Sequence, residues 1–425
     1  MSSDPVGGRK AVVVGQGYVG LPLAVRAASV GYQVVGFDVS ELRVKQLADG
    51  VSFTDDVPSA QLQEALDSGR YVVTSSDQMC AAFDIAVVTV PTPLKAGNPD
   101  LSFIEAAAAM LSRHLCPGAL VVLESTTYPG TTTELVAPAL EAGSGLAAGK
   151  DFYLGYSPER IDPGNKSFTL VNTPKVVSGI DAESLGQVKR FYDSIVERTV
   201  PVSSTAEAEL TKLLENTFRH VNVALVNELA MLAADLGVDV WEAIEAASTK
   251  PFGFMPFLPG PGVGGHCLPI DPSYLSWRIK RRLGRSFRFV ELANRINAGM
   301  PDHVVWRISE GLQRRGIDVR SARILLLGLA YKANTGDARE SPALAVADRL
   351  LTLGADVRAA DPYISWNEVP AQVVRVEPER HEVAAADAVV LLVDHRAFDL
   401  PAIVDAATFV FDTRHRMSGD NVEFL

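Results

Sequence analysis

The chain begins with a strand, a glycine-rich turn and a helix, followed by a second strand that ends on an acid. The first apolar run covers 11–14 and leads into the turn Gly15-Gln16-Gly17-Tyr18-Val19-Gly20, and the next strand ends on Asp38. Glycines at these spacings allow a tight turn and let a pyrophosphate approach the backbone at the N-terminus of the helix. Further strands at 85–90 and 120–123 alternate with helices, which predicts a doubly wound parallel sheet.

Asp38 indicates NAD as the cofactor. An acid at this place accepts hydrogen bonds from the adenosine ribose and repels the 2′-phosphate of NADP, although the nearby Arg43 weakens that preference slightly. The loops that hold Thr92 and Thr126 follow two other strands, and ligands of such sheets bind beyond the carboxyl ends of the strands. Both loops are therefore expected to border the nicotinamide. The alternative for the glycine turn is that it serves packing alone. The alternative for the two loops is that their hydroxyl groups only form turns and helix caps.

A weak internal repeat predicts a second domain of the same class. Residues 31–38 (GYQVVGFD) resemble 354–361 (GADVRAAD), with glycine and acid at the same spacing, and 84–90 resembles 387–393. The second copy begins at the strand 323–328 and carries no GxGxxG turn. Two Rossmann-like domains are therefore expected, of which only the first is shaped for a dinucleotide.

Apolar residues at helical spacing predict a long helix from Thr205 onward, between these two domains. They are Leu210, Leu213, Leu214, Phe218, Val221, Leu225 and Leu229. So long an amphipathic helix is a natural dimer interface, and we expect a homodimer or a higher homo-oligomer. The predicted fold is α/β, with two Rossmann-like doubly wound parallel-sheet domains joined by a long central helix and a helical domain. The expected boundaries are 1–202, 203–316 and 317–425.

Composition excludes several classes of function. A net charge of -12 disfavours binding to nucleic acid and gives no support to an anionic membrane partner. Three widely spaced cysteines without a CxxC pair argue against disulfides or a zinc site, and the histidines show no metal-ligand spacing, so no metal is expected. A short polar N-terminus without a signal peptide and the lack of a long apolar run predict a cytoplasmic protein.

Cys267 lies in a run rich in glycine and proline that predicts a catalytic thiol. The run is Pro259-Gly260-Pro261-Gly262-Val263-Gly264-Gly265-His266-Cys267-Leu268-Pro269-Ile270-Asp271-Pro272. Glycine lets the backbone come close to a ligand, and Asp271 is placed to orient a water or a proton near the sulfur. An enzyme that takes an alcohol through an aldehyde to an acid needs a thiol, because a thiohemiacetal can lose a second hydride. The alternative is a buried structural cysteine.

Other candidate side chains are weaker by themselves. Lys212 and Asn216 share one helix face, where a lysine can polarise a hydroxyl, bind a phosphate, stabilise an oxyanion or simply be solvated. Glu159, among prolines, is a candidate general base for water, or else a surface charge. Cations that follow strands of the second Rossmann-like half suit phosphate groups. These cations are Lys332, Arg339 and Arg414.

Seven motifs in order resemble the UDP-glucose/GDP-mannose dehydrogenase family over essentially the whole chain. They are GQGYVGLPLA from Gly15, VPTP from Val90, ESTTYPGTT from Glu124, YSPERIDPGN from Tyr156, the pair Lys212 and Asn216, GGHCLPIDP from Gly264 and GLAYKANTGDARESPA from Gly328. The resemblance implies oxidation of the C6 alcohol of a nucleotide sugar to a carboxylate, with two NAD reduced per sugar.

The resemblance also implies residue roles. Cys267 forms a thiohemiacetal and then a thioester, Lys212 with Asn216 stabilises charge on the C6 oxygen, Asp271 positions water or relays protons, Glu159 assists hydrolysis, and Thr126 lies at the same site. The implied NAD contacts are Gly15, Gly17, Tyr18, Val19, Gly20, Asp38, Arg43, Thr92, Thr126 and Arg339. The implied contacts with the nucleotide sugar are Glu159, Arg160, Lys212, Asn216, Leu258, Gly262, Gly264, Tyr331, Lys332 and Arg414.

The segment after Tyr156 predicts the substrate class. Arg160 follows Glu159, and Pro163 stands where UDP-glucose members usually carry a second acid. This form looks like the branch that acts on UDP-N-acetylhexosamines such as UDP-N-acetylglucosamine, with UDP-glucose or dTDP-glucose as alternatives. A single-hydride dehydrogenase would need neither Cys267 nor a second Rossmann-like half. A catalytically inactive nucleotide-sensing scaffold would not need to retain Cys267 and Lys212.

Overall fold

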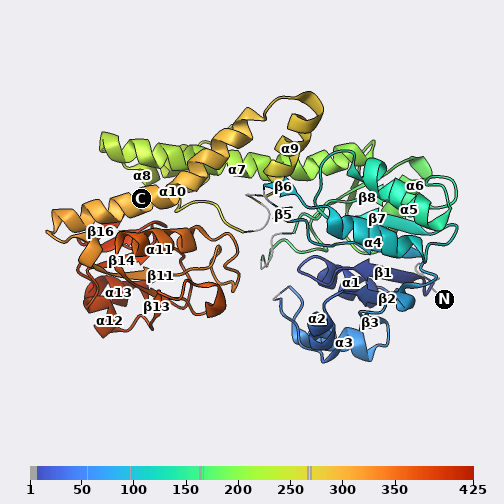
Figure 1. The fold of residues 1–425 in the computed structure, drawn as a ribbon, viewed down its shortest axis with the longest axis horizontal. Helices are drawn as coiled ribbons and strands as arrows, with labels where there is room; N and C mark the ends of the chain where they lie inside the picture. The colour runs from blue at the N-terminus through green and yellow to red at the C-terminus, as the bar shows by residue number, and fades with distance from the viewer. Residues whose placement is uncertain are drawn as a thin grey trace. The chain divides into compact units, whose positions relative to one another are not determined.

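The computed structural model describes residues 7–54, 56–95, 97–161, 165, 167–265, 268 and 270–425. Contacts within the chain divide it into two compact units, each built around its own sheet (Figure 1). Unit 1 comprises the residues up to Glu215 together with Ser273–Arg278, and unit 2 comprises Asn216–Pro272 together with Ile279–Leu425. The prediction of an α/β protein with two Rossmann-like sheets is confirmed.

The sheet of unit 1 has eight strands in the order β10-β9-β8-β7-β4-β1-β2-β3. In chain order these strands are β1 Lys10–Val14, β2 Gln33–Phe37, β3 Tyr71–Thr74, β4 Ile85–Val88, β7 Leu120–Leu123, β8 Tyr153–Tyr156, β9 Lys175–Gly179 and β10 Thr199–Pro201. Neighbouring strands pair in parallel except β8 and β9, which are antiparallel. The strands from β3 to β8 thus form the doubly wound sheet, and β9 and β10 extend its edge. A small antiparallel pair, β5 Leu94–Lys95 with β6 Asn98–Pro99, lies apart from it.

The strands of unit 1 are apolar throughout because both faces of the sheet are covered. Val13 packs into one core with α1 and α6, and Val12 packs into the opposite core with α4 and α5. The helices of this unit are α1 Gly20–Ser29, α2 Glu41–Ala48, α3 Ser59–Asp67, α4 Ser102–Ser112, α5 Ala137–Ser144 and α6 Ala182–Asp193. Short 3-10 and π turns occur at η1 Asp77–Cys80 and η2 Thr132–Val136.

The sheet of unit 2 repeats the arrangement with six parallel strands in the order β13-β12-β11-β14-β15-β16. They are β11 Arg323–Leu327, β12 Asp356–Ala360, β13 Val374–Arg375, β14 Ala388–Leu391, β15 Val410–Asp412 and β16 Val422–Phe424. Leu326 packs against α10 Arg288–Arg314 and α11 Pro342–Leu353, while Leu325 faces α12 Arg380–Ala384 and α13 Leu400–Ala406. The 3-10 turns are η3 Val319–Ser321 and η4 Trp366–Glu368.

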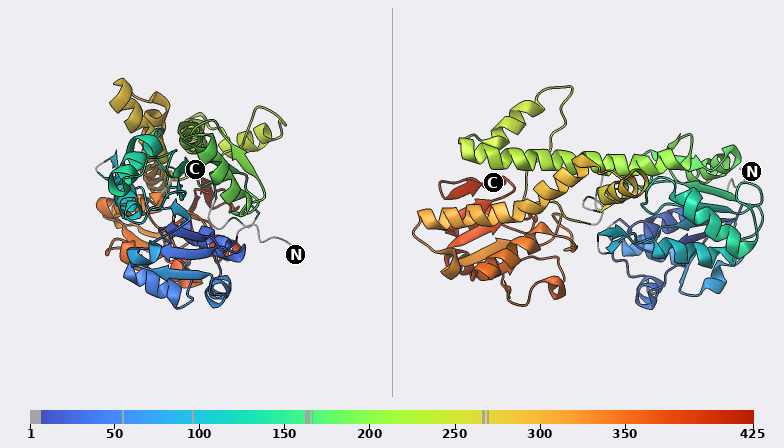
Figure 2. Two further views of the ribbon diagram at one scale, coloured as in Figure 1. Left: turned by 90° about the vertical axis from the view of Figure 1, so that its right-hand side faces the viewer. Right: turned by 45° about the horizontal axis from the view of Figure 1, so that its top comes forward.

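The predicted long helix is a single element, α7 Thr205–Leu236, 32 residues in length (Figure 2). It begins at the residue predicted for its start, and its first eleven residues belong to unit 1 and the rest to unit 2. Two further helices follow, α8 Val240–Ser248 and α9 Asp271–Leu283.

Candidate active site

The glycine turn of unit 1 has the form that a dinucleotide requires. A Cβ at Gly15, whose φ is +93°, would lie 2.8 Å from the carbonyl oxygen of Thr89, and one at Gly20 would lie 1.8 Å from the carbonyl oxygen of Gly15. Gly17, in contrast, has open space where a Cβ would stand, with no described atom within 4 Å. Two of the glycines are therefore needed for the turn itself, and the third keeps its outer surface open at the N-terminus of α1, where backbone N–H groups favour an anion.

Asp38 follows β2 beside this turn, and Arg43 lies on α2. The Asp38 carboxylate accepts hydrogen bonds from the backbone N–H groups of Gln16, at 2.8 Å, and Ser40, at 2.9 Å. The Arg43 guanidinium lies 3.4 Å from the centroid of the Phe53 ring, and its Nη1 is buried without a partner among the described residues. Burial lowers the pKa of this guanidinium. A fixed carboxylate and a stacked cation with a spare donor fit an adenosine moiety.

The loop that holds Thr92 follows β4, and the loop that holds Thr126 follows the neighbouring strand β7. The switch point of this sheet lies between β1 and β4, so the first loop lies at the switch point and the second lies next to it. The Ser125 hydroxyl donates to the Val90 carbonyl at 2.8 Å and thereby ties the loop after β7 to the loop after β4. Thr92 is buried, and Thr126 is half-buried next to this hydrogen bond. Both predicted threonines thus stand at the carboxyl ends of strands, where this class of sheet binds its ligand.

A buried cluster of charges lies just behind these loops. The Lys175 ammonium, at the start of β9, donates to the carboxylates of Glu124 and Glu159, the second at 2.8 Å, and the Tyr192 hydroxyl donates to Glu124 at 3.0 Å. The side chains of Lys175 and Glu124 are 3% and 0% exposed. Burial raises the pKa of Glu124 above its ordinary value. Burial acts in the same direction on Glu159, but the Lys175 charge and hydrogen bonds overcome it and lower the pKa of that carboxyl.

Glu159 also forms a hydrogen bond with Lys212, which lies on α7. Its Oε1 accepts the backbone N–H groups of Arg160 and Ile161, both at 2.6 Å, and its backbone carbonyl accepts Lys212 Nζ at 2.6 Å. Lys212 is only 8% exposed, so it is not a solvated surface lysine. The Arg160 guanidinium is held by Glu215, at 2.7 Å, and by the Pro174 carbonyl, at 2.6 Å.

A second anchor from the first turns of α7 was not predicted. The Glu209 carboxylate, fully buried, accepts the backbone N–H groups of Gly130, at 2.6 Å, and Thr132, at 2.9 Å, and the Thr132 hydroxyl at 2.6 Å. Burial raises the pKa of this carboxyl to about 7. The same helix therefore holds the loop after β7 through Glu209 and the loop after β8 through Lys212.

Lys175, Glu124 and Glu209 are the functional candidates that sequence reasoning missed. From the sequence alone, Lys175 is expected to be the exposed first residue of a strand, and Glu209 is expected to be an ordinary solvated acid on a helix. Of these three residues, only Glu124 could have been predicted from the sequence, because it begins the ESTTYPGTT motif at the end of an apolar strand.

In unit 2, two of the predicted catalytic side chains are in contact. The Asn216 amide donates to Asp271 Oδ2 at 2.5 Å, and Asp271, the first residue of α9, is 2% exposed. Cys267, the predicted nucleophile, lies outside the described residues.

The glycine loop that precedes Cys267 packs closely on the second Rossmann-like half. A Cβ at Gly264 would lie 2.7 Å from the Glu340 carbonyl oxygen and 3.0 Å from Tyr331 Cβ, and one at Gly260 would lie 3.0 Å from Arg414 Nη1. The Gly265 N–H donates to the Arg339 carbonyl at 3.2 Å. Gly264 is thus packed against Tyr331 with no room for a Cβ, and Gly260 lies beside Arg414. A Cβ at Gly262 would instead lie 3.0 Å from Pro342 and 3.1 Å from the Asn297 carbonyl oxygen.

The other predicted binding residues of unit 2 are more open. Leu258 is 61% exposed, and Lys332 is half-buried. The exposed Arg339 pairs through its guanidinium with Asp337, at 2.5 Å and 2.9 Å.

Asp361, which repeats the position of Asp38, has a different use. Its carboxylate accepts the backbone N–H groups of Leu329, at 2.7 Å, and Ala330, at 3.1 Å, and contacts His395 Nε2 at 3.0 Å. The Asn334 N–H donates to His395 Nδ1 at 2.9 Å, so Nε2 carries the hydrogen and donates to Asp361. The acid that would face a ribose in a dinucleotide domain instead holds the loop that begins at Leu329.

Among the described residues, no group of His, Cys, Asp and Glu side chains is arranged to hold a metal ion. None of the helices in the described part of the chain is both long and apolar enough to cross a membrane.

Two doubly wound sheets, of which one carries a dinucleotide turn with an acid after its second strand, define a dinucleotide-binding protein of the Rossmann class. Family models for the UDP-glucose/GDP-mannose dehydrogenase family match the chain along most of its length: the NAD binding domain at 9–196, the central domain at 206–299 and the UDP binding domain at 325–418. The chain belongs to this family and is an NAD-dependent nucleotide-sugar dehydrogenase. The resemblance predicted from seven motifs and the NAD cofactor are confirmed.

Relatives cover almost the whole chain. A UDP-N-acetyl-D-mannosamine dehydrogenase of Pyrococcus horikoshii is 38% identical over 91% of this chain and 89% of its own length. A UDP-N-acetyl-D-glucosamine 6-dehydrogenase of Pseudomonas aeruginosa is 38% identical over 92% of this chain and 91% of its own. The solved structure of the UDP-D-ManNAc dehydrogenase from Pyrococcus horikoshii superposes with a TM-score of 0.88 at 35% identity, covering 98% of both chains.

Proposed function

We propose that this chain oxidises the C6 alcohol of a UDP-N-acetylhexosamine, with UDP-N-acetylglucosamine the first candidate, to the uronic acid with two NAD per sugar. Relatives named for the N-acetylmannosamine and the N-acetylglucosamine nucleotides match it at the same 38% identity, which supports an N-acetylated hexose. UDP-glucose or dTDP-glucose is the second candidate, with the same chemistry. The Arg160 guanidinium is already bound to Glu215 and to the Pro174 carbonyl. The choice of an N-acetylated sugar is therefore inferred from the relatives, and not from a hydrogen bond between Arg160 and the sugar.

The reaction proceeds through the Cys267 thiol. Loss of a proton and a hydride turns the alcohol into an aldehyde, and the Cys267 thiolate adds to the aldehyde carbon to form a C–S bond. The thiohemiacetal then loses a second hydride and a proton and becomes a thioester. Water adds to the thioester carbonyl, the C–S bond breaks, and the carboxylate is released as the thiolate is restored. Bound NAD supplies the hydride acceptor for both oxidations.

The side chains of α7 and α9 supply the polar groups for these steps. In this proposal the Lys212 ammonium stabilises the charge that develops on the C6 oxygen, with Asn216 beside it, and Asp271 positions water or relays protons. Asp38, Arg43, Thr92, Thr126 and Arg339 serve NAD, together with the turn from Gly15 to Gly20. Leu258, Gly262, Gly264, Tyr331, Lys332 and Arg414 serve the nucleotide sugar.

The observation that supports a role for the Cys267 segment beside the nucleotide is the packing of the glycine loop in unit 2. The loop that ends two residues before Cys267 lies against Tyr331 and beside the Arg414 guanidinium. Arg414 is itself held by a hydrogen bond from its Nε to the Leu392 carbonyl at 2.7 Å. A guanidinium at the carboxyl end of a strand suits a phosphate, so the segment that supplies the thiol is also a wall of the proposed nucleotide site.

The stoichiometry of NADH tests this function. We expect two NADH and one uronic acid per UDP-sugar, and no acid from a Cys267→Ser variant, because a serine hydroxyl is a far weaker nucleophile than a thiolate. Cys116→Ser, which changes an exposed cysteine, is the matched control. Full turnover by Cys267→Ser, or one NADH per sugar in the wild type, would contradict the proposed mechanism. Steady-state kinetics with UDP-GlcNAc, UDP-ManNAc, UDP-GalNAc, UDP-glucose and dTDP-glucose test the substrate, and a higher kcat/KM for either glucose nucleotide would reverse its assignment.

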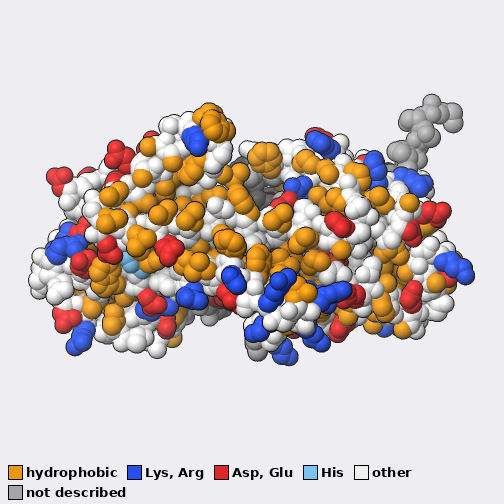
Figure 3. Space-filling view, turned by 90° about the horizontal axis from the view of Figure 1, so that it is seen from above, with side chains coloured by type: hydrophobic (Ala, Val, Ile, Leu, Met, Phe, Trp, Pro, Cys, Tyr) orange, Lys and Arg blue, Asp and Glu red, His pale blue; other side chains and the backbone are white. Residues whose placement is uncertain are grey.

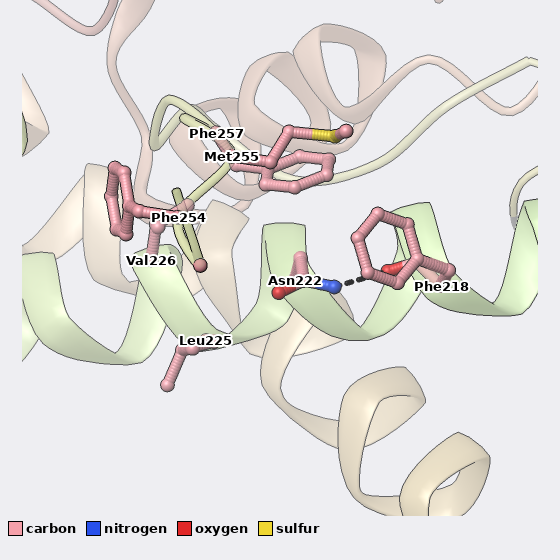
Figure 4. A pocket seen from close by; sticks show the side chains of 8 residues that line it. Phe218, Asn222, Leu225, Val226, Phe254, Met255 and Phe257 are labelled. Carbon is pink, nitrogen blue, oxygen red and sulfur yellow. Dashed lines mark hydrogen bonds between the residues drawn. The ribbon is translucent and has the colours of Figure 1, made fainter. Parts of the chain in front are cut away.

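We also propose that the enzyme is a homodimer or a higher homo-oligomer through α7. Large apolar side chains recur on its exposed surface, and Figure 3 shows hydrophobic side chains gathered on this face. They include Leu214 at 63%, Phe218 at 47%, Leu225 at 52% and Leu229 at 45% exposed. In unit 2, Phe218 and Leu225 also line a cavity of about 540 Å³ with Phe254, Met255 and Phe257 (Figure 4). Sedimentation of the wild type and of Leu225→Glu tests this, and a monomeric wild type would refute it.

A further inference from the structure

We propose that Asn227 is a positioning residue of the nucleotide site, which holds the glycine loop 260–265 in place beside Arg414. It does so through a buried chain of hydrogen bonds that continues to Asn297 and His220. All of these residues belong to unit 2. The inference rests on the proposed function in one respect, which is the assignment of the glycine loop and Arg414 to the nucleotide.

The glycine loop has a single backbone donor at its start. Gly260 stands between Pro259 and Pro261, and proline has no N–H, so the Gly260 N–H is the one backbone donor of these three residues. Gly260 is buried, and its N–H donates to Asn227 Oδ1 at 2.9 Å. A buried N–H without an acceptor is unfavourable, so the position of this part of the loop depends on Asn227.

The donor at Gly260 sets the direction of every bond in the chain. Because a backbone N–H can only donate, the Asn227 oxygen faces Gly260, and the Asn227 amide nitrogen donates to Asn297 Oδ1 at 2.9 Å. The Asn297 amide nitrogen then faces His220 and lies 3.4 Å from both the backbone carbonyl oxygen and Nδ1 of that residue. Nδ1 is therefore the acceptor of the ring, and Nε2 carries the hydrogen and donates to Asn294 Oδ1 at 2.7 Å. Each amide and the ring thus have one orientation that satisfies all of these bonds.

The chain of hydrogen bonds joins two long helices inside unit 2. Asn227 and His220 lie on α7 and are 0% and 2% exposed, and Asn297 lies on α10 and is 5% exposed. Burial lowers the pKa of His220, which keeps its ring neutral at neutral pH, as an accepting Nδ1 requires. Side chains buried to this degree act on a ligand through their neighbours. A buried polar chain in which every member is paired specifies one arrangement of the groups that it joins.

The other side of the loop faces the second Rossmann-like half. A Cβ at Gly260 would lie 3.0 Å from Arg414 Nη1, and the Gly265 N–H donates to the Arg339 carbonyl at 3.2 Å. The loop is therefore tied to α7 at one end and to Arg339 at the other. When the bond to α7 is lost, we expect the loop to occupy its place beside Arg414 for only a fraction of the time. The observed Kd then rises by the inverse of that fraction, although no group that contacts the nucleotide has changed.

Titration calorimetry with UDP tests the inference on two variants of the full chain. Asn227→Leu keeps the approximate size of the side chain but removes the acceptor for Gly260, and it is expected to raise the Kd for UDP about tenfold. Asn297→Leu leaves that acceptor in place but removes the group that orients it, so a smaller rise is expected. The Kd for NAD is expected to stay at its wild-type value in both variants, because the dinucleotide turn belongs to unit 1. Calorimetry gives the number of sites separately from the affinity, so an unfolded fraction does not imitate weak binding.

A matched control and a conservative variant separate positioning from loss of fold. Asn421→Leu removes two hydrogen bonds of another asparagine in unit 2, those to the Val404 and Ala407 carbonyls, and it is expected to lower stability but to bind UDP as the wild type does. Asn227→Asp retains an acceptor for Gly260 and is expected to bind UDP at least about threefold more tightly than Asn227→Leu. Hydrogen exchange at the Gly260 N–H is expected to be faster in Asn227→Leu than in the wild type.

A wild-type Kd for UDP in Asn227→Leu refutes the inference. An equal loss of UDP affinity in Asn227→Leu and Asn421→Leu refutes it too, because a general loss of packing would then explain both results. The proposed function is decided by a different readout, the formation of uronic acid from UDP-N-acetylhexosamines. A wild type that makes no uronic acid, together with the expected pattern of UDP affinities, would remove the proposed reaction and support the positioning role of Asn227.

Discussion

Replacement of Glu209 by glutamine is expected to change how stability depends on pH. Glu209 lies fully buried on α7 and accepts three hydrogen bonds from Gly130 and Thr132. Burial nevertheless raises the pKa of its carboxyl from an ordinary 4.5 to about 7, because desolvation outweighs those bonds. The folded protein therefore keeps a proton on Glu209 at pH values where the unfolded chain has lost it.

The sign and size follow from proton linkage. The unfolded chain binds fewer protons between pH 4.5 and 7, so the contribution of Glu209 to the free energy of unfolding is complete below pH 4.5 and is lost as pH rises through about 7. A pKa shift of this size contributes about 3 kcal/mol in total to the free energy of unfolding, and about 2 to 3 kcal/mol of this contribution is lost between pH 5 and pH 8.5. Glutamine cannot ionise. From pH 5 to pH 8.5, the free energy of unfolding of Glu209→Gln is therefore expected to rise by that amount relative to wild type. Any cost of burying the amide is the same at both pH values and does not change this difference.

Urea unfolding of both proteins at pH 5 and pH 8.5 measures this double difference, in which the titration of every other group cancels. Hydrogen exchange over 120–136 identifies the transition that belongs to unit 1. Glu105→Gln, an exposed change on α4, is the control and is expected to follow wild type at both pH values. If the wild type and Glu209→Gln differ by the same free energy at pH 5 and pH 8.5, the carboxyl is ionised in the fold and the reasoning is wrong.

Three further predictions concern binding and turnover. Asp38→Ala is expected to narrow the preference for NAD over NADP by weakening NAD use more than NADP use, and equal kcat/KM values for the two cofactors in the wild type would contradict this. Lys212→Ala is expected to lower kcat about 100-fold with little change in KM, since one electrostatic contact with the transition state is lost; a pure KM effect would make Lys212 a binding residue. His395→Phe removes both hydrogen bonds of a buried ring and is expected to weaken UDP about tenfold in calorimetry, because an unpaired buried group costs about 1 to 3 kcal/mol and the loop at Leu329 loosens. Unchanged UDP affinity would mean that His395 serves packing alone.

Local pattern was enough to predict the architecture. The turn at Gly15 and the apolar runs of β1, β4 and β11 predicted two doubly wound sheets, because strands covered on both faces are apolar at every position. The start of α7 at Thr205 was predicted from helical periodicity. The repeat between 31–38 and 354–361 marked equivalent strands, since each segment ends on the acid that follows the second strand of its sheet.

The same local pattern could not distinguish the tasks of equivalent residues. Asp38 and Asp361 follow matching strands at the same spacing from a glycine. Asp38 holds the dinucleotide turn through Gln16, whereas Asp361 is closed off by His395, which lies 34 residues further along the chain. Only the order of the strands brings His395 to that place.

The amino-acid sequence by itself determined the family, the cofactor and the residues that belong to short motifs, because motif residues are neighbours along the chain. Tertiary structure decided how the charges are paired. Lys175 stands 51 residues from Glu124 and 16 from Glu159, and Glu209 stands 77 from Thr132. Such pairs form where strands of distant sequence end side by side and exclude water, so whether a carboxylate is a base, an anchor or a proton carrier depends on burial and partners that no local spacing reveals.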